Sequence, residues 1–316
     1  SPPVPYVPDV EAWAAVYSEG FVGHLARVQA HAGEGAPVSD AQARYPVLLF
    51  SSGFGMSRHF YTGLLEGLAS HGYVVAALDR PYLNMMQMPD GSVRSPRDGF
   101  WDAFPATRGI GSLEAAVRQL RFTEGYLGAD QDAVLAELSR IDRGDPHGVL
   151  TGRLDLGRVV NLAHSAGAIP ARALLVDPEA PYRGFVFYDA KVHHTTGSRT
   201  LTLPVEGEVR APVLFVALEY AAPPPPSFAD QLRAPLYIVQ MEGTAHGSVS
   251  DLPALDAAAE GDAEASERAA AHLQTLVSRT VDFVRASLDP EHTLGDAWQT
   301  AEEGVAEVQV LVPAQR

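Results

Sequence analysis

Residues 161–168 place a serine among small residues at the spacing of a nucleophile elbow. The segment reads Asn-Leu-Ala-His-Ser-Ala-Gly-Ala and follows the apolar run 156–160. In such an elbow a strand turns sharply into a helix, so the positions two before and two after the serine carry small side chains. Ala163 and Gly167 satisfy this, although glycine is the usual residue at the first position. The pattern predicts that the Ser165 hydroxyl projects above the end of a strand, where a base can activate it as a nucleophile.

A serine nucleophile needs a base, a carboxylate that orients the base, and donors that stabilise an oxyanion. His246 follows the apolar run 235–241 and lies in the loop Glu-Gly-Thr-Ala-His-Gly-Ser. The small residues of this loop let it carry an imidazole over the edge of a sheet, so we expect His246 to be the base. His164 is adjacent to the nucleophile, and the geometry of the elbow is expected to point it away from the base position.

Two carboxylates are candidates for the acid. Asp189 ends the apolar run 184–188, and Glu219 ends the run 212–218, one strand later. Either strand tip can bring a carboxylate to the far nitrogen of His246. The periodicity of the sequence does not choose between them, so both remain candidates at this point.

Short apolar runs alternate with helical stretches along the chain, which indicates an α/β fold with a mostly parallel sheet. The runs are continuously apolar, as in strands covered on both faces. Helices are expected at 59–70, 112–127, 132–141 and 166–176, and a final long helix carries an apolar stripe from Leu273 to Leu288. Pro170 lies inside the helix after the elbow and should cost it a hydrogen bond. We expect strands at 46–51, 73–78, 156–162, 184–188, 212–218 and 235–241.

Several segments depart from this alternation. Residues 84–96 contain the turn signal Met-Pro-Asp-Gly-Ser and predict a hairpin. An irregular aromatic stretch follows, and together they form an insertion at 82–110, after the fourth strand of the fold. The insertion offers an apolar wall over the acyl site, although its side chains could equally serve only to pack it onto the domain. The residues concerned are Met85, Met86, Met88, Phe100, Trp101 and Phe104.

The ends of the chain lack a strong pattern. Residues 1–40 have no clear period and are expected to be irregular, residues 251–268 to be a solvated connection or helix start, and residues 291–316 to be an extension whose segment 305–312 adds an edge strand. We see no internal repeat and no second core, so residues 1–316 are interpreted as one domain. The chain begins Ser-Pro-Pro without methionine. This beginning fits either a mature secreted form or a shortened chain, and the sequence does not separate the two.

Composition excludes several classes of function. The formal net charge is −16, which repels phosphate backbones and anionic membranes, so no nucleic-acid partner is expected. The absence of cysteine excludes disulfides, thiolate metal sites and cysteine nucleophiles. No spacing typical of a metal site occurs, and we expect neither a catalytic metal nor a cofactor. No run of 18 apolar residues occurs, so no integral membrane association is expected.

Several motifs, in order from about residue 46 to 252, resemble the platelet-activating-factor acetylhydrolase-like branch of the α/β-hydrolases. They are Pro-Val-Leu-Leu-Phe-Ser-Ser-Gly-Phe-Gly at 46–55, Leu-Ala-Ser-His-Gly-Tyr-Val-Val-Ala-Ala at 68–77, the elbow, Phe-Tyr-Asp-Ala at 187–190, and Gly-Thr-Ala-His at 243–246 with Ser-Asp at 250–251. The resemblance implies an α/β-hydrolase fold and an esterase or lipase that acts on a small-molecule or lipid-like ester. It implies a triad of Ser165, Asp189 and His246, because that branch takes its acid from the earlier strand.

The resemblance also implies an oxyanion hole made by the backbone N–H groups of Phe54 and Ala166. The branch usually has His-Gly where this chain has Ser52 and Gly53. Because the oxyanion donor is a backbone group, it can survive this change, while the contacts that hold its loop are expected to differ. The insertion lies outside the shared motifs, so the resemblance does not supply a substrate.

Three alternatives use the same scaffold. An acyltransferase would deliver the acyl group to an alcohol or amine, and an amidase or peptidase would cleave an amide with the same residues. A non-catalytic binding module is the third. The presence of serine, acid and histidine in order, with the small residues of the elbow, argues against it, because modules of that kind generally lose a member of the triad.

Overall fold

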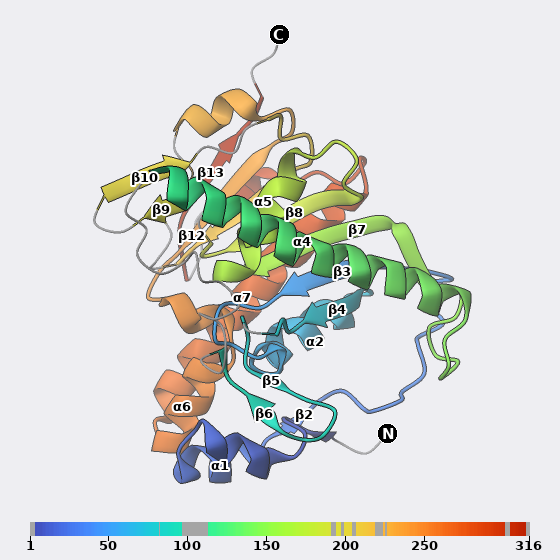
Figure 1. Ribbon diagram of the computed structural model, residues 1–316, viewed down its shortest axis with the longest axis vertical. Coiled ribbons are helices and arrows are strands. Elements are labelled where there is room, and N and C mark those ends of the chain that lie inside the picture. Colours follow the sequence, from blue (N-terminus) through green and yellow to red (C-terminus); the bar gives the residue numbers. More distant parts are fainter. Residues whose placement is uncertain are drawn as a thin grey trace.

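A seven-stranded sheet forms the centre of the molecule (Figure 1). The computed structural model describes residues 4–81, 83–96, 113–190, 194–196, 199–203, 207–218, 224, 226–300 and 304–313. The strand order is β13-β12-β11-β8-β7-β3-β4, and all neighbouring strands are parallel except β13, which is antiparallel to β12. The bounds are β3 (Tyr45–Ser51), β4 (Val74–Leu78), β7 (Leu154–His164), β8 (Tyr182–Tyr188), β11 (Val213–Ala217), β12 (Leu236–Met241) and β13 (Val305–Leu311).

Helices cover both faces of this sheet, which explains why its central strands are continuously apolar. On β3, Val47 and Leu49 face the layer of α4 (Leu113–Arg143) and α5 (Ile169–Val176). Leu48 and Phe50 face the opposite layer, made by α2 (Thr62–Ser70) and α7 (Ala263–Leu288). Figure 1 shows α4 crossing one face of the sheet. The mostly parallel sheet with helices on both faces is therefore confirmed, as is the edge strand expected at 305–312, which pairs antiparallel to β12.

The helical boundaries differ from expectation in two places. The two helices expected at 112–127 and 132–141 are one helix, α4, held to the sheet by Gln131. This buried amide donates to Ser51 and accepts from Asn161 and Tyr182. It lies in the segment 128–131, between the two expected helices, where α4 is continuous. Pro170 costs α5 no hydrogen bond, because a 3₁₀ turn (Ser165–Ala168) comes first and the proline falls in the first turn of the α-helix.

The N-terminal segment is structured, contrary to the expectation of an irregular stretch. Strands β1 (Val4–Pro5) and β2 (Gln29–Ala30) pair, and between them lie a 3₁₀ helix (Val10–Ala15) and α1 (Glu19–Leu25). Trp13 is fully buried in a separate apolar cluster that includes Phe60 and Leu255. Each element is too short to show a period in the sequence, which is why the pattern missed it.

Helix α6 (Leu252–Glu260) and the beginning of α7 occupy the segment 251–268, so the structure bears out the expected helix start rather than the solvated connection. Gly261, at φ +82°, ends α6 in the left-handed region, and the Asp262 side chain then caps α7 by accepting from the backbone N–H of Ala265. Figure 1 shows α6 beside α1 of the N-terminal segment. Within the part of the chain that the structure covers, no helix has the length and apolarity to cross a bilayer.

The predicted hairpin is present as β5 (Met86–Gln87) and β6 (Val93–Arg94). Gly91 adopts φ +82° in its turn, as the Asp-Gly signal predicts. Met85 packs against the N-terminal cluster, and Met86 is half-buried beside Arg94. Phe100, Trp101 and Phe104, the aromatic part of the predicted wall, lie outside the described residues. A second short pair, β9 (His194–Thr196) and β10 (Arg199–Leu203), follows β8.

Candidate active site

The elbow at Ser165 has the backbone that its sequence predicts. Ser165 follows the last residue of β7 and adopts φ +52°, a left-handed conformation that side chains disfavour. A Cβ on Gly167 would lie 2.4 Å from the carbonyl oxygen of Ser51 and 2.7 Å from that of Ser52. Ala163 is completely buried. The small residues are therefore required because the turn packs directly against the end of β3.

Ser165, His246 and Asp189 form a continuous hydrogen-bonded series. The Ser165 Oγ lies 2.9 Å from His246 Nε2, and His246 Nδ1 lies 2.6 Å from Asp189 Oδ2. Because the carboxylate can only accept when ionised, Nδ1 carries the proton of the neutral ring and Nε2 is left to accept from the serine hydroxyl. The three residues come from the ends of β7 and β8 and from the loop after β12, so the parallel sheet brings them to one edge.

Asp189 is held rigidly at the end of β8. Its side chain is fully buried and its backbone adopts φ +43°. The backbone N–H of Asp189 donates to Val216, and Oδ1 accepts from the N–H of Leu218 at 3.0 Å. One carboxylate oxygen is thus fixed by the neighbouring strand while the other faces His246. The alternative acid, Glu219, lies outside the described residues.

The loop after β3 lies directly beside the nucleophile. A Cβ on Gly53 would be 3.3 Å from the Cβ of Ser165, so the loop backbone touches the elbow. Asn84 donates to the Gly53 carbonyl at 2.6 Å, and Gly55 N–H donates to Leu83. The side chain of Phe54 is 48% exposed. The loop backbone is therefore held by these hydrogen bonds, while Phe54 is exposed to solvent.

Ser52 stands where the resembling branch usually has histidine, and its side chain is fully buried. Its hydroxyl lies within hydrogen-bonding distance of the Leu78 carbonyl and of Asp79 Oδ1. The Asp79 carboxylate also accepts from the Ser57 hydroxyl and from the N–H and guanidinium of Arg58. Burial raises the pKa of Asp79, while the Arg58 charge opposes this shift. The loop is consequently tied to the end of β4.

His164 contacts His246, the expected base, contrary to the expectation that the elbow would point it away. Its Nε2 lies 3.0 Å from the backbone carbonyl oxygen of His246, and the two ring centroids are 4.7 Å apart. Its Nδ1 lies 2.7 Å from the hydroxyl of Tyr61. Burial, followed by the neighbouring His246, lowers the pKa of His164 to about 3, so the ring is neutral. The sequence does not indicate that Tyr61 belongs to this site, because His164, which its hydroxyl contacts, is 103 positions away along the chain.

Asp251 anchors the far end of the histidine loop. Its carboxylate accepts from the Tyr6 hydroxyl at 2.6 Å and from the Gly63 N–H at the beginning of α2. Its own N–H donates to the Phe60 carbonyl at 2.7 Å. Burial raises the pKa of Asp251 to about 6. One buried carboxyl therefore joins the N-terminal segment, α2 and the loop of His246.

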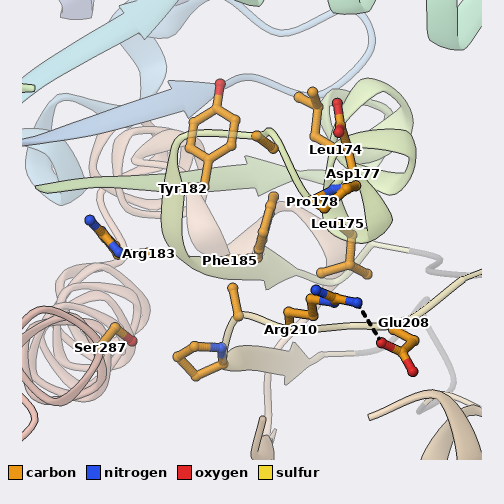
Figure 2. A pocket seen from close by; sticks show the side chains of 13 residues that line it. Leu174, Leu175, Asp177, Pro178, Tyr182, Arg183, Phe185, Glu208, Arg210 and Ser287 are labelled. Carbon is orange, nitrogen blue, oxygen red and sulfur yellow. Dashed lines mark hydrogen bonds and ion pairs between the residues drawn. The ribbon is translucent and has the colours of Figure 1, made fainter. Parts of the chain in front are cut away.

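The larger hollows found among the described residues lie away from Ser165. One, of about 360 Å³, opens where β8 begins, at the opposite end of that strand from Asp189, and Figure 2 shows the Arg210–Glu208 ion pair on its wall. The other, of about 790 Å³, lies between α2 and α7 and has apolar walls that include Leu273 and Val277. Across the residues the structure covers, no three His, Asp or Glu side chains gather as metal ligands would.

Comparison with known proteins agrees with the resemblance inferred from the motifs. A family model described as platelet-activating factor acetylhydrolase, isoform II, matches residues 11–81. The platelet-activating factor acetylhydrolase of Cavia porcellus is 28% identical in an alignment 137 residues long, and the match covers 39% of this chain. The match spans only 30% of that relative's length.

A solved structure extends the likeness to the whole fold. A ferulic acid esterase from Streptomyces cinnamoneus superposes with a TM-score of 0.66 and covers 98% of this chain and 85% of its own, at 23% sequence identity. At this identity the superposition establishes architecture rather than substrate. Together with the sheet order and the elbow, it shows that the chain has the α/β-hydrolase fold, with sequence similarity to the platelet-activating factor acetylhydrolases.

Proposed function

We propose that this protein is a serine hydrolase that cleaves carboxylic esters through an acyl-enzyme intermediate. The observation that carries the proposal is the series from Ser165 Oγ to His246 Nε2, at 2.9 Å, and from His246 Nδ1 to Asp189 Oδ2, at 2.6 Å. These distances fit proton transfer from the hydroxyl to the ring without rearrangement. The similarity to acetylhydrolases supports the same reaction class.

In the proposed reaction His246 removes the Ser165 proton as the oxygen attacks the ester carbonyl. Asp189 keeps the proton of the resting ring on Nδ1 and stabilises the imidazolium that forms. His246 then gives its proton to the leaving alcohol, and a water molecule repeats the two steps on the acyl-enzyme. The contact between Asp189 Oδ1 and the Leu218 N–H supports this role, because it fixes the carboxylate before reaction.

The proposed oxyanion hole consists of the backbone N–H groups of Phe54 and Ala166. Ala166 follows the nucleophile at the beginning of the 3₁₀ turn, and Phe54 follows Gly53, whose backbone touches Ser165. Donors fixed before reaction stabilise the developing negative charge without reorganisation. The bonds that hold Gly53 and Gly55 support such a fixed loop.

The proposed substrate is a small-molecule or lipid-like ester with an apolar group near the reacting carbon. The exposed Phe54, which follows Gly53 in the loop that contacts Ser165, supports an apolar acyl or alkyl part. The net charge of −16 disfavours polyanionic substrates. We also propose that Met85, Met86, Trp101 and Phe104 border this site, although the packing of Met85 against the N-terminal cluster gives that residue a structural role as well.

A fluorophosphonate probe followed by a panel of p-nitrophenyl esters of increasing chain length tests this proposal. We expect covalent labelling and ester turnover in the wild type, and neither above background in Ser165→Ala, whose turnover should fall on the order of 10⁴-fold or more. Parallel reactions with an amide analogue and with a competing alcohol acceptor separate an amidase and an acyltransferase from a hydrolase. Unchanged turnover in Ser165→Ala would overturn the proposal.

A further inference from the structure

We infer that Tyr61 and His164 are positioning residues that lock the loop of the proposed oxyanion hole to the loop of the proposed base, through one directional chain of hydrogen bonds. The chain runs from the Gly53 N–H to the Tyr61 oxygen at 3.2 Å, then to His164 Nδ1 at 2.7 Å, and from His164 Nε2 to the His246 carbonyl at 3.0 Å. The inference rests on the proposed function, since it concerns how that site is held.

The direction of each bond follows from the two ends of the chain. The His246 carbonyl can only accept, so His164 Nε2 must carry the ring proton. The neutral ring then has a lone pair on Nδ1, so the Tyr61 hydroxyl must donate to it. The Gly53 N–H can only donate, and it donates to the same hydroxyl oxygen. All three bonds are satisfied by one tautomer of His164.

Burial leaves Tyr61 and His164 without water as an alternative hydrogen-bond partner. Tyr61 is completely buried and His164 is 2% exposed, so neither side chain can replace a lost partner with water. Burial also keeps both groups neutral, because it lowers the pKa of His164 and raises that of Tyr61. A proton on Nδ1 of His164 would force the Tyr61 hydroxyl hydrogen to turn away from the nitrogen that now accepts it.

His164 is in contact with three parts of the proposed site. Its backbone immediately precedes Ser165, its Nε2 holds the backbone of His246, and its ring lies against Gly53. A Cβ on Gly53 would be 2.9 Å from His164 Nδ1, so the contact with the loop is close. Loss of the chain should therefore displace the oxyanion donors relative to the base without removing any reacting group.

The test compares Tyr61→Phe with Tyr182→Phe. Tyr182 is also a buried tyrosine whose hydroxyl donates to one partner, Gln131, but it lies at the far end of β8. We expect Tyr61→Phe to lower kcat roughly tenfold to a hundredfold with KM nearly unchanged, because a buried N–H loses its acceptor and neither residue touches substrate. Tyr182→Phe should lose at most about twofold in kcat. Equal kcat values in the two variants would overturn the inference.

A second pair of variants and a spectrum keep the inference testable if one variant folds poorly. His164→Gln retains an N–H near the Nε2 position and should keep more kcat than His164→Leu, which retains none. Nitrogen NMR of the ring should place the His164 proton on Nε2 in the wild type, and the Nδ1 resonance should shift in Tyr61→Phe, where that nitrogen loses its hydrogen-bond donor. A proton on Nδ1 in the wild type would refute the chain. Absence of Ser165-dependent turnover would instead refute the proposed function, and the ring spectrum would still decide the direction of the bonds.

Discussion

Asp189 Oδ2 lies 2.6 Å from His246 Nδ1, although the two residues are 57 positions apart and belong to different loops at the sheet edge. The carboxylate is fully buried, and its second oxygen is occupied by the Leu218 N–H. A buried carboxylate with both oxygens engaged has a fixed orientation, and so does the imidazole that it binds. This pair defines which nitrogen of His246 faces Ser165.

The first prediction concerns the proposed acid. Asp189→Asn should lower kcat roughly 10³ to 10⁴-fold near neutral pH, because an amide favours the wrong tautomer of His246 and cannot stabilise its cation. Glu219→Gln, which changes the other candidate in the same way, should cost about tenfold or less. Both are measured by ester turnover, after circular dichroism shows that the variants fold. A larger loss of kcat in Glu219→Gln than in Asp189→Asn would show that Glu219, and not Asp189, is the acid.

A second prediction concerns how nucleophile and base act together. His246→Ala should be as severe as Ser165→Ala, and the double variant should be no worse than either single one, because the two residues act in one step. The measurement is kcat/KM for one activated ester in all three variants. Multiplicative losses would show that the residues contribute to separate steps.

The third prediction concerns the elbow. Gly167→Ala should lower the free energy of unfolding by roughly 1–3 kcal/mol or more, because the added carbon meets backbone atoms that cannot move aside. Gly125→Ala is the matched control: a Cβ there meets nothing within 4 Å, and Gly125 lies on the exposed side of α4. That change should stabilise the helix by about 0.5–1 kcal/mol. Urea unfolding compares the two, and equal stabilities would contradict the prediction.

A fourth prediction follows from Asp251. Its pKa is raised to about 6, so the folded chain binds a proton that the unfolded chain has already lost. The contribution of this carboxyl to stability is therefore greatest below about pH 4 and is lost as the pH rises through about 6, a change on the order of 3 kcal/mol. Asp251→Asn should remove that part of the pH dependence of unfolding. Asp40→Asn, at a side chain that is 99% exposed, should leave it intact.

The fifth prediction concerns the substrate wall. Trp101→Ala should shift the preference for chain length while preserving turnover of the shortest ester, because an adaptable apolar wall contacts only longer chains. The panel of p-nitrophenyl esters measures this. A uniform loss across all chain lengths, together with a lower melting temperature, would show instead that Trp101 packs the insertion onto the domain.

The sheet, Ser165 and His246 could be predicted from sequence because their signals are local, whereas local signals left Asp189 and Glu219 both open and only the family resemblance favoured Asp189. Strands buried on both faces are continuously apolar, as Val47 to Phe50 illustrate, and the elbow requires small residues at fixed spacing. The position of His246 after β12 follows from the order of strands along the chain. Each of these features can be recognised without knowing which distant residues are in contact.

The features that the sequence did not predict depend on distant contacts. Nothing near Tyr61 indicates that its hydroxyl lies against His164, and nothing near Gln131 indicates that it joins α4 to three strands. Trp13 is buried by Phe60, which comes from a different part of the chain, so its own surroundings in sequence show no amphipathic period. The contacts of Tyr61 and Gln131 and the burial of Trp13 are determined by tertiary packing, which a local sequence pattern does not show.

Strand β13 has a consequence for self-association. It pairs antiparallel along β12 from Leu236 to Met241, and the Glu242 N–H continues the contact by donating to Gly304. Without β13, the sheet would end in a largely buried, apolar strand whose backbone groups lack partners, and such an edge readily recruits a strand from another molecule. The outward-facing Glu307 and Gln309 of β13 make the actual border polar. Strand β13 thus moves this edge of the sheet from an apolar strand to one with exposed polar side chains, which is a poorer template for edge-to-edge pairing.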